Sequence, residues 1–294
     1  EGRPGADPVA EILAAQERGD HRHALSLFEE NGGVYFIHFH GNDACLEVLN
    51  RFPPEMADAG ETLTLARAMH ALKAGNVTHA RFLMVRRFGE DAHSLETVIR
   101  DAGRFSLAVR QFRFVMAIYE DYAVSNELRA LLFDMLAELP IDDHLHRGSF
   151  YNAMLAVCLQ RRQLNEAEEV ARRAHHHYRE AGAHLLVFYI ELHRVVFSLR
   201  RGMLGEAERW AAQARQALDA VRFDTPADRR LLNLLDSVIA YEKGAPEHLV
   251  RFVAEEFDKF AYGELWPIVV ELALAYCSQV VSRQVGLGAA ISFL

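Results

Sequence analysis

Lysine is scarce in this sequence. Of its 32 basic residues only Lys73, Lys243 and Lys259 are lysines, and the rest are arginines. None of the three follows a glycine, whereas the phosphate-binding P-loop requires a glycine directly before its lysine. The net charge is -9, and no dense run of basic residues interrupts it. Surfaces that bind nucleic acid are usually basic, so we do not expect these residues to bind DNA or RNA themselves.

Cysteine is also rare. Cys45, Cys158 and Cys277 lie far apart, and no two of them form a C-x-x-C pair. This argues against a disulfide framework and a cysteine zinc site, and it fits a reducing compartment. The longest apolar runs, such as residues 34–37 and 268–270, are far shorter than the roughly 20 residues that cross a bilayer, and we find no signal peptide. We therefore expect a cytoplasmic protein without a membrane partner.

Catalytic motifs are missing as well. The sequence has no G-x-S-x-G nucleophile elbow, and its 15 histidines form no H-E-x-x-H zinc motif. Acidic pairs such as Glu168-Glu169 are neighbours on expected helices, where adjacent side chains diverge. The segments 142–146 and 175–177 fit a polar turn and a solvated helix face better than a metal site, which stays a third alternative. We expect no enzyme activity, no cofactor and no metal.

What the sequence does contain is a repeat. A glycine, four further residues and an alanine recur between segments of helical character. The copies begin at Gly19, Gly75, Gly103 and Gly202, and two degenerate copies begin at Arg162 and Gly244. Glycine favours the left-handed conformation that ends a helix, and alanine lets the next helix cross closely over the first. The pattern therefore predicts repeated helix pairs.

Two copies of the repeat match over a whole helix. The apolar positions Leu164, Ala167, Val170, Ala171, Ala174 and Tyr178 recur 40 residues later as Leu204, Ala207, Trp210, Ala211, Ala214 and Leu218. This spacing places them on one face of an α-helix. A weaker third copy covers residues 105–119, with Gln111 breaking the stripe.

The rest of the chain also reads as helical. No segment alternates with a period of two, so even the aromatic segment 34–39 is predicted to be helix. Asp7-Pro8 and Thr225-Pro226 predict helix starts, and Pro53-Pro54 and Pro140 predict breaks between helices. Short loops make successive helices antiparallel, and no flexible linker is visible. The sequence therefore predicts an all-α fold, a TPR-like helix-pair superhelix (an α-solenoid) that forms one continuous domain over residues 1–294.

The helix-Gly-helix unit resembles the tetratricopeptide repeat (TPR), although its spacing departs from the usual one of about 34 residues. Residues 155–174, LAVCLQRRQLNEAEEVARRA, are similar to the MalT-like repeat region of large LuxR-type bacterial transcription regulators. Residues 181–193 and 232–244 resemble the same group. The resemblance implies a region that senses an inducer or binds a partner, with DNA bound only through a C-terminal helix-turn-helix domain expected beyond residue 294. Because such regulators commonly match two-fold DNA sites, we expect a homodimer.

A ligand site in such a superhelix would lie in its concave groove, which the first helix of each pair lines. The candidate residues are Asn152, Tyr189, His193, Glu191 and Arg113, of which the last two supply charge. A purely structural role for Tyr189 and His193 is the alternative. We expect the effector-binding or partner-binding region of a LuxR-type regulator, with a small molecule or a protein as ligand. The alternative function is a TPR-like protein–protein adaptor without an effector.

Overall fold

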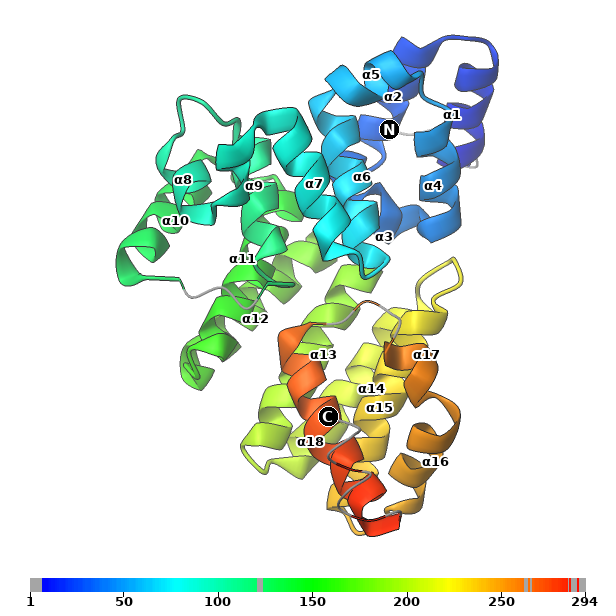
Figure 1. Cartoon of the computed structure of the whole chain (residues 1–294), viewed down its shortest axis with the longest axis vertical. Helices are drawn as coiled ribbons and strands as arrows, with labels where there is room; N and C mark the ends of the chain where they lie inside the picture. The colour runs from blue at the N-terminus through cyan, green and yellow to red at the C-terminus, as the bar shows by residue number, and fades with distance from the viewer. Residues whose placement is uncertain are drawn as a thin grey trace. The chain divides into compact units, whose positions relative to one another are not determined.

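The predicted all-α class is confirmed. The computed structural model describes residues 7–120, 124–261, 264, 266–284, 286 and 290, and the side chains of residues 57–59 are not described. Within these residues the regular structure consists of α-helices and two short 3-10 helices, and no strand occurs (Figure 1). The chain divides into two compact units, Glu1–Arg113 with Arg222–Asp224, and Phe114–Val221 with Thr225–Leu294. This division does not test the expectation that residues 1–294 form one continuous domain, which stays a prediction.

Unit 1 contains the helices of the first third of the chain. Its elements are α1 (Pro8–Glu17), α2 (His21–Glu30), η1 (Gly33–Tyr35), α3 (Phe36–His40), α4 (Asn42–Asn50), α5 (Pro54–Ala59), α6 (Glu61–Lys73), α7 (Val77–Phe88), η2 (Glu90–His93) and α8 (Leu95–Arg100). Helix α1 packs against α2, and α6 packs against α7. The division between the units falls within α9 (Leu107–Met116). The aromatic segment 34–39 is helical, as predicted, because it lies in η1 and α3.

Unit 2 is built mainly from longer helices. They are α10 (Asn126–Glu138), α11 (His144–Gln160), α12 (Leu164–Glu180), α13 (His184–Arg200), α14 (Leu204–Asp219), α15 (Pro226–Glu242), α16 (Glu247–Glu255), α17 (Phe257–Ala261) and α18 (Pro267–Gln284). From α11 to α16 each helix packs against the next one along the chain (Figure 1). Helix α18 packs against both α13 and α16.

Six turns between consecutive helices share one backbone arrangement. In each, a residue with positive φ ends the first helix, and its N–H and the next N–H donate to carbonyls of the last helical turn, which is a Schellman motif. These residues are Gly19, Gly75, Arg162, Gly182, Gly202 and Gly244. Arg162, with φ 57°, is the one residue other than glycine that has a positive φ in the described part of the chain. The prediction was wrong for Gly103, which lacks a positive φ and follows the end of α8 in a turn.

The alanines of the repeat pack where paired helices cross, as predicted. Side chains at this position are fully buried in five copies, namely Ala24, Ala80, Ala167, Ala207 and Leu249. In the copy at Gly103, by contrast, Ala108 is only half-buried. The apolar stripe of α12 is buried from Ala167 to Tyr178, so the periodicity in the sequence identified the inner face of this helix.

Helices α11 and α12 approach closely at Gly148. A Cβ atom added there would lie 2.6 Å from Cδ1 of Tyr178, well inside the normal contact distance. Tyr178 is itself fully buried, so its ring has little room to move aside. The absence of a side chain at Gly148 therefore sets the distance between these two helices.

The predicted helix starts are confirmed. Asp7 caps α1, and its carboxylate accepts a hydrogen bond of 3.0 Å from the N–H of Val9. Helix α15 begins at Pro226, although the side chain of Thr225 makes no capping hydrogen bond. Helix α5 begins at Pro54, as the Pro53-Pro54 break predicts.

The three cysteines are buried and form no disulfide. Burial raises the pKa of the Cys45 and Cys277 thiols to about 12, and it raises the pKa of Cys158 above its ordinary value. The thiols therefore pack as small apolar groups. None of the helices in the described residues is long and apolar enough to pass through a bilayer.

Candidate ligand-binding site

Helix α13 lies in the core of unit 2. Every residue from 185 to 199 is buried, because the helix is apolar on nearly all sides and a helix without a polar face packs inside a protein. The few polar side chains on it must therefore find partners away from water. The side chains that contact these polar residues form the candidate site.

Tyr189 and His193 share one side of α13 and contact the same indole ring. The hydroxyl of Tyr189 donates to Oδ1 of Asp228 at 2.7 Å, and burial together with this carboxylate raises the pKa of Tyr189 well above its ordinary value. Trp266 stacks on the imidazole of His193 with a centroid distance of 5.0 Å and an interplanar angle of 6°. Its ring also meets Tyr189 edge-on at 5.0 Å. The three side chains form an aromatic cluster beside α13.

The buried imidazole of His193 is neutral and has a defined tautomer. Its Nδ1 lies 2.8 Å from the carbonyl oxygen of Tyr189 and therefore carries the proton, because a carbonyl can only accept. Burial lowers the pKa of His193 from 6.5 to about 4. Nε2 is left as an acceptor, and this buried atom has no hydrogen-bond partner among the described residues. A buried acceptor without a partner is rare in folded proteins and calls for an explanation.

Trp266 shares a hydrogen-bond acceptor, the carboxylate of Glu264, with Tyr119. Its Nε1–H donates to Oε1 of Glu264 at 3.1 Å, and the hydroxyl of Tyr119 donates to the same oxygen at 2.6 Å. Trp266 is 4% exposed although it precedes α18 rather than lying within a helix. The indole therefore keeps a defined position over His193.

A cavity of about 360 Å³ opens beside this aromatic cluster. Its lining residues, all of which belong to unit 2, are Ile118, Ala156, Leu159, Gln160, Arg162, His193, Arg200, Trp266, Pro267, Ile268 and Glu271. The volume lies at the lower end of the range of small-molecule pockets, which begins at about 300 Å³. The walls come from α11, α13 and α18, three elements that are distant in the sequence.

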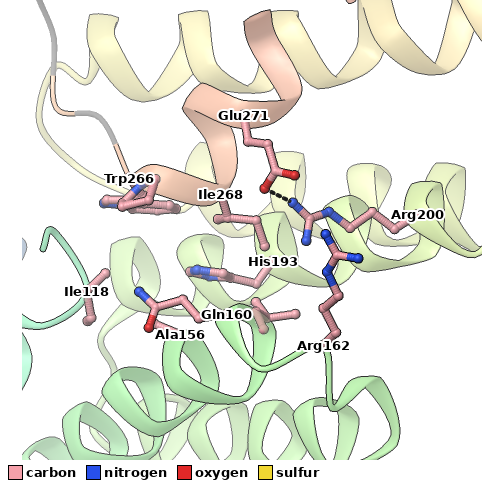
Figure 2. A pocket seen from close by; sticks show the side chains of 11 residues that line it. Ile118, Ala156, Gln160, Arg162, His193, Arg200, Trp266, Ile268 and Glu271 are labelled. Carbon is pink, nitrogen blue, oxygen red and sulfur yellow. Dashed lines mark hydrogen bonds and ion pairs between the residues drawn. The ribbon is translucent and has the colours of Figure 1, made fainter. Parts of the chain in front are cut away.

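The cavity has an apolar side and a charged side, as Figure 2 shows. Figure 2 draws Trp266 and Ile118 on one side of the cavity and the side chains of Arg162 and Arg200, which also line it, on the other. Nη2 of Arg200 also pairs with Oε2 of Glu271 on α18. A mostly apolar pocket with a few polar groups at defined positions is the usual form of a small-molecule site.

Glu191 belongs to a separate buried cluster on the same helix. Two residues along a helix correspond to a rotation of about 200°, so Glu191 points away from the side that carries Tyr189. Its Oε1 lies 3.3 Å from Nη1 of Arg194 and 3.3 Å from Nε2 of His175. Arg194 in turn lies over the ring of Trp210 at 4.4 Å. Burial raises the pKa of Glu191 to about 7, and the charge of Arg194 opposes the rise.

The other two predicted groove residues also lie apart from the cavity lining. Asn152 on α11 is 8% exposed, and its Oδ1 is buried without a hydrogen-bond partner among the described residues. Arg113 belongs to unit 1, where its Nε and Nη2 donate to the carbonyl of His93 at 3.1 and 2.8 Å. Of the five predicted residues, His193 lines the cavity and Tyr189 contacts the indole that lines it.

The histidine-rich segments make contacts typical of a helix start and a helix pair. Asp143 caps α11 and accepts from the N–H of His146 at 3.1 Å. Nδ1 of His144 lies 3.0 Å from Nδ1 of His177, and the ring of His177 stacks on Tyr151. In the part of the chain that the structure describes, no group of three or more His, Cys, Asp or Glu side chains is arranged to hold a metal ion.

Sequence reasoning missed several residues of the site. Trp266, Arg200 and Glu271 carried no signal, because neither their spacing nor their neighbours distinguish them from ordinary helix residues. Arg162 did carry one: it stands where four other copies of the repeat have the glycine that ends a helix. The substitution was read as degeneracy of the repeat rather than as a functional residue.

No protein-family model, curated protein or solved structure matches this chain. The resemblance to LuxR-type regulators therefore stays a prediction from the repeat segments. The function must be inferred from the geometry of the cavity and from those segments.

Proposed function

We propose that this chain is the effector-binding region of a LuxR-type bacterial transcription regulator and acts by binding rather than by catalysis. The cavity beside Trp266 and His193 is the effector site, and the observation that carries the proposal is its composition. A ligand-sized space combines apolar side chains with two arginines and a buried acceptor that has no hydrogen-bond partner among the described residues.

We further propose that the helices form a TPR-like superhelix. The repeated Schellman turns support this, because the same one-residue turn gives successive helix pairs the same geometry. The fully buried alanine in four of the copies, Ala24, Ala80, Ala167 and Ala207, supports it as well. In the regulators that the chain resembles, a separate helix-turn-helix domain binds DNA, and effector occupancy would be passed to such a domain.

Binding rather than catalysis is favoured by the way the polar groups are held. A general acid–base pair must lie within hydrogen-bond reach of one reacting atom. The acidic group with a pKa near 7, Glu191, points away from the side of α13 that carries the neutral His193. The imidazole is stacked under Trp266, and such a rigid aromatic contact suits recognition of a ligand.

The test is a thermal-shift screen of the purified chain against a metabolite library. A ligand at about 100 times its dissociation constant adds roughly 2.7 kcal/mol of stability, which raises Tm by several degrees for a chain of this size. A hit is assigned to the cavity with Ile268→Trp, which fills the space from α18. Ile141→Trp is the matched control, because Ile141 is 84% exposed and does not line the cavity.

We expect a hit whose shift disappears in Ile268→Trp and persists in Ile141→Trp. A hit that both variants bind equally well would move the effector site away from this cavity. If a well-folded chain gives no hit at all, the effector-sensing function is not supported.

A protein–protein adaptor is the second candidate, and one observation favours it. Arg162 and Arg200 both line the cavity, and two arginines at one site can hold the C-terminal carboxylate of a peptide. An adaptor would bind a peptide with a free C-terminus and lose it when that terminus is amidated. Titrating the purified chain with a peptide that has a free C-terminus, and with its amidated form, separates the two candidates.

A further inference from the structure

Several polar groups that line the cavity have hydrogen-bond donors or acceptors that the described residues leave unpaired. Within the described residues, the guanidinium of Arg162 and the amide of Gln160 make no side-chain hydrogen bond and no ion pair. His193 adds the buried Nε2, which also lacks a partner there. Arg200 makes one contact, to Glu271, and leaves further N–H donors for a ligand. Two positively charged donor groups thus line the same small space, and one residue of the lining, His193, carries a buried neutral acceptor.

Arg162 is held in this space by an unfavourable backbone conformation. It occupies the left-handed position of a Schellman turn, where the other five turns have glycine. Residues with a Cβ are disfavoured in this conformation, and such strain gathers at functional sites. A glycine would make the same turn without strain, so the fold does not require an arginine here. What arginine adds is a guanidinium at the cavity, which Arg200 also lines (Figure 2).

The charge of the lining specifies the charge of the ligand. The chain has a net charge of -9, but the ionised side chains at the cavity are two arginines, Arg162 and Arg200, and one carboxylate, Glu271. The lining therefore has one positive charge in excess within an acidic protein. A ligand with a single negative charge balances it, and the planar arginine fork matches a carboxylate.

The apolar side of the cavity specifies the rest of the ligand. Trp266, Ile268 and Leu159 contribute apolar surface to the lining. The unprotonated Nε2 of His193 is a buried acceptor without a partner among the described residues, so it would pair with a hydroxyl or amide N–H of a ligand rather than with another acceptor. The cavity volume of about 360 Å³ limits the ligand to a small molecule.

We propose that the effector is a small organic acid whose single carboxylate lies between Arg162 and Arg200 and whose apolar body lies against Trp266. This inference rests on the proposed function and names the chemical class of its effector. Arg162 is the specificity-determining residue, because of the two arginines that line the cavity it is the one whose guanidinium makes no hydrogen bond or ion pair with the described residues.

The experiment is calorimetric titration of the full chain with acids and their neutral amides. The matched probes are benzoate and benzamide, phenylacetate and phenylacetamide, 4-hydroxyphenylacetate and its amide, and hexanoate and hexanamide. We expect at least one acid to bind and its amide to bind about tenfold more weakly or worse, as for other charge-assisted hydrogen bonds. The hydroxylated acid should bind more tightly than phenylacetate if its hydroxyl reaches His193.

Arg162→Gly tests the assignment of the carboxylate. The variant removes the guanidinium and restores the residue found in the other five turns, so it should fold with an unchanged or higher Tm. We expect it to bind the acid about tenfold more weakly or worse. Arg172→Gln is the control: it removes the same charge from an exposed side chain that pairs with Glu169 on the same helix, and it should bind normally.

The outcomes distinguish this inference from the proposed function. If the amides bind as tightly as the acids, or Arg162→Gly binds normally, the organic-acid inference is wrong while the cavity remains an effector site. Tighter binding of phenyl phosphate than of every carboxylate would overturn the assigned ligand class. If no acid binds at millimolar concentration, the inference also fails, and the metabolite screen decides on the function separately. Binding of a free peptide C-terminus in place of small acids would support the adaptor.

Discussion

Replacing His193 with glutamine should make unit 2 less sensitive to acid. Burial lowers the pKa of the folded imidazole to about 4, whereas in the unfolded chain it titrates near 6.5. The unfolded chain therefore binds more protons between these values. The contribution to stability is fully present above pH 6.5 and is lost as the pH falls toward 4. Going from about pH 7.5 to about pH 5, this single group should lower the free energy of unfolding by ~2 kcal/mol.

Urea unfolding followed by tryptophan fluorescence measures this effect in unit 2. Both tryptophans of the chain, Trp210 and Trp266, belong to that unit. His193→Gln loses the stack with Trp266 and is less stable at every pH, so the quantity to compare is the loss between the two pH values. That loss should be ~2 kcal/mol smaller in His193→Gln than in the unaltered chain. The remaining histidines contribute equally to the pH dependence of stability in both proteins, so their contributions cancel in the comparison.

The control is His248→Gln, because His248 is an exposed side chain outside the aromatic cluster. His248→Gln should lose the same free energy of unfolding between the two pH values as the unaltered chain. If His193→Gln also shows that same loss, the buried imidazole does not gain a proton on unfolding. The neutral state of His193, and with it the acceptor assigned to Nε2, would then be wrong.

Three further predictions concern packing and the backbone. Arg162→Gly should raise the free energy of unfolding in the absence of ligand by up to ~1 kcal/mol, because it relieves the left-handed strain, and urea unfolding measures this. Gly148→Ala should lower it by about 1–3 kcal/mol, because the new Cβ meets Tyr178. Gly205→Ala, whose Cβ meets nothing within 4 Å, should be neutral or stabilising, and a similar loss in both variants would contradict the packing argument. The three buried thiols should resist a thiol reagent until the chain unfolds, and their rapid reaction in native protein would contradict their burial.

The fold could be predicted from the sequence where the signal was local. The glycine and alanine of each repeat copy are five residues apart and act within one turn and one helix crossing. Short-range rules of this kind depend on backbone conformation and side-chain size, so they gave the helix pairs and the buried face of α12. The copy at Gly103 failed because a glycine in a turn need not end a helix.

The site could be predicted only in part, because it depends on contacts between distant segments. His193 and Trp266 stack across 73 residues of sequence, and no periodicity links them. The groove prediction also assumed that α13 exposes one side, whereas this helix is buried all round. On such a helix Glu191 and His193 both count as inward-facing, and only the packed structure shows that they face different neighbours.

The left-handed arginine also has a consequence for the genetics of this protein. Every arginine codon becomes a glycine codon through one base change, so the relaxed form of the turn at Arg162 is always a single mutation away. A variant library sorted only for heat resistance would collect that mutation early, whereas a library sorted for response to an effector would retain the codon for arginine. Attempts to stabilise this chain should therefore keep Arg162 unchanged, because on the proposed function this side chain lowers the stability of the fold and is needed for the response to the effector.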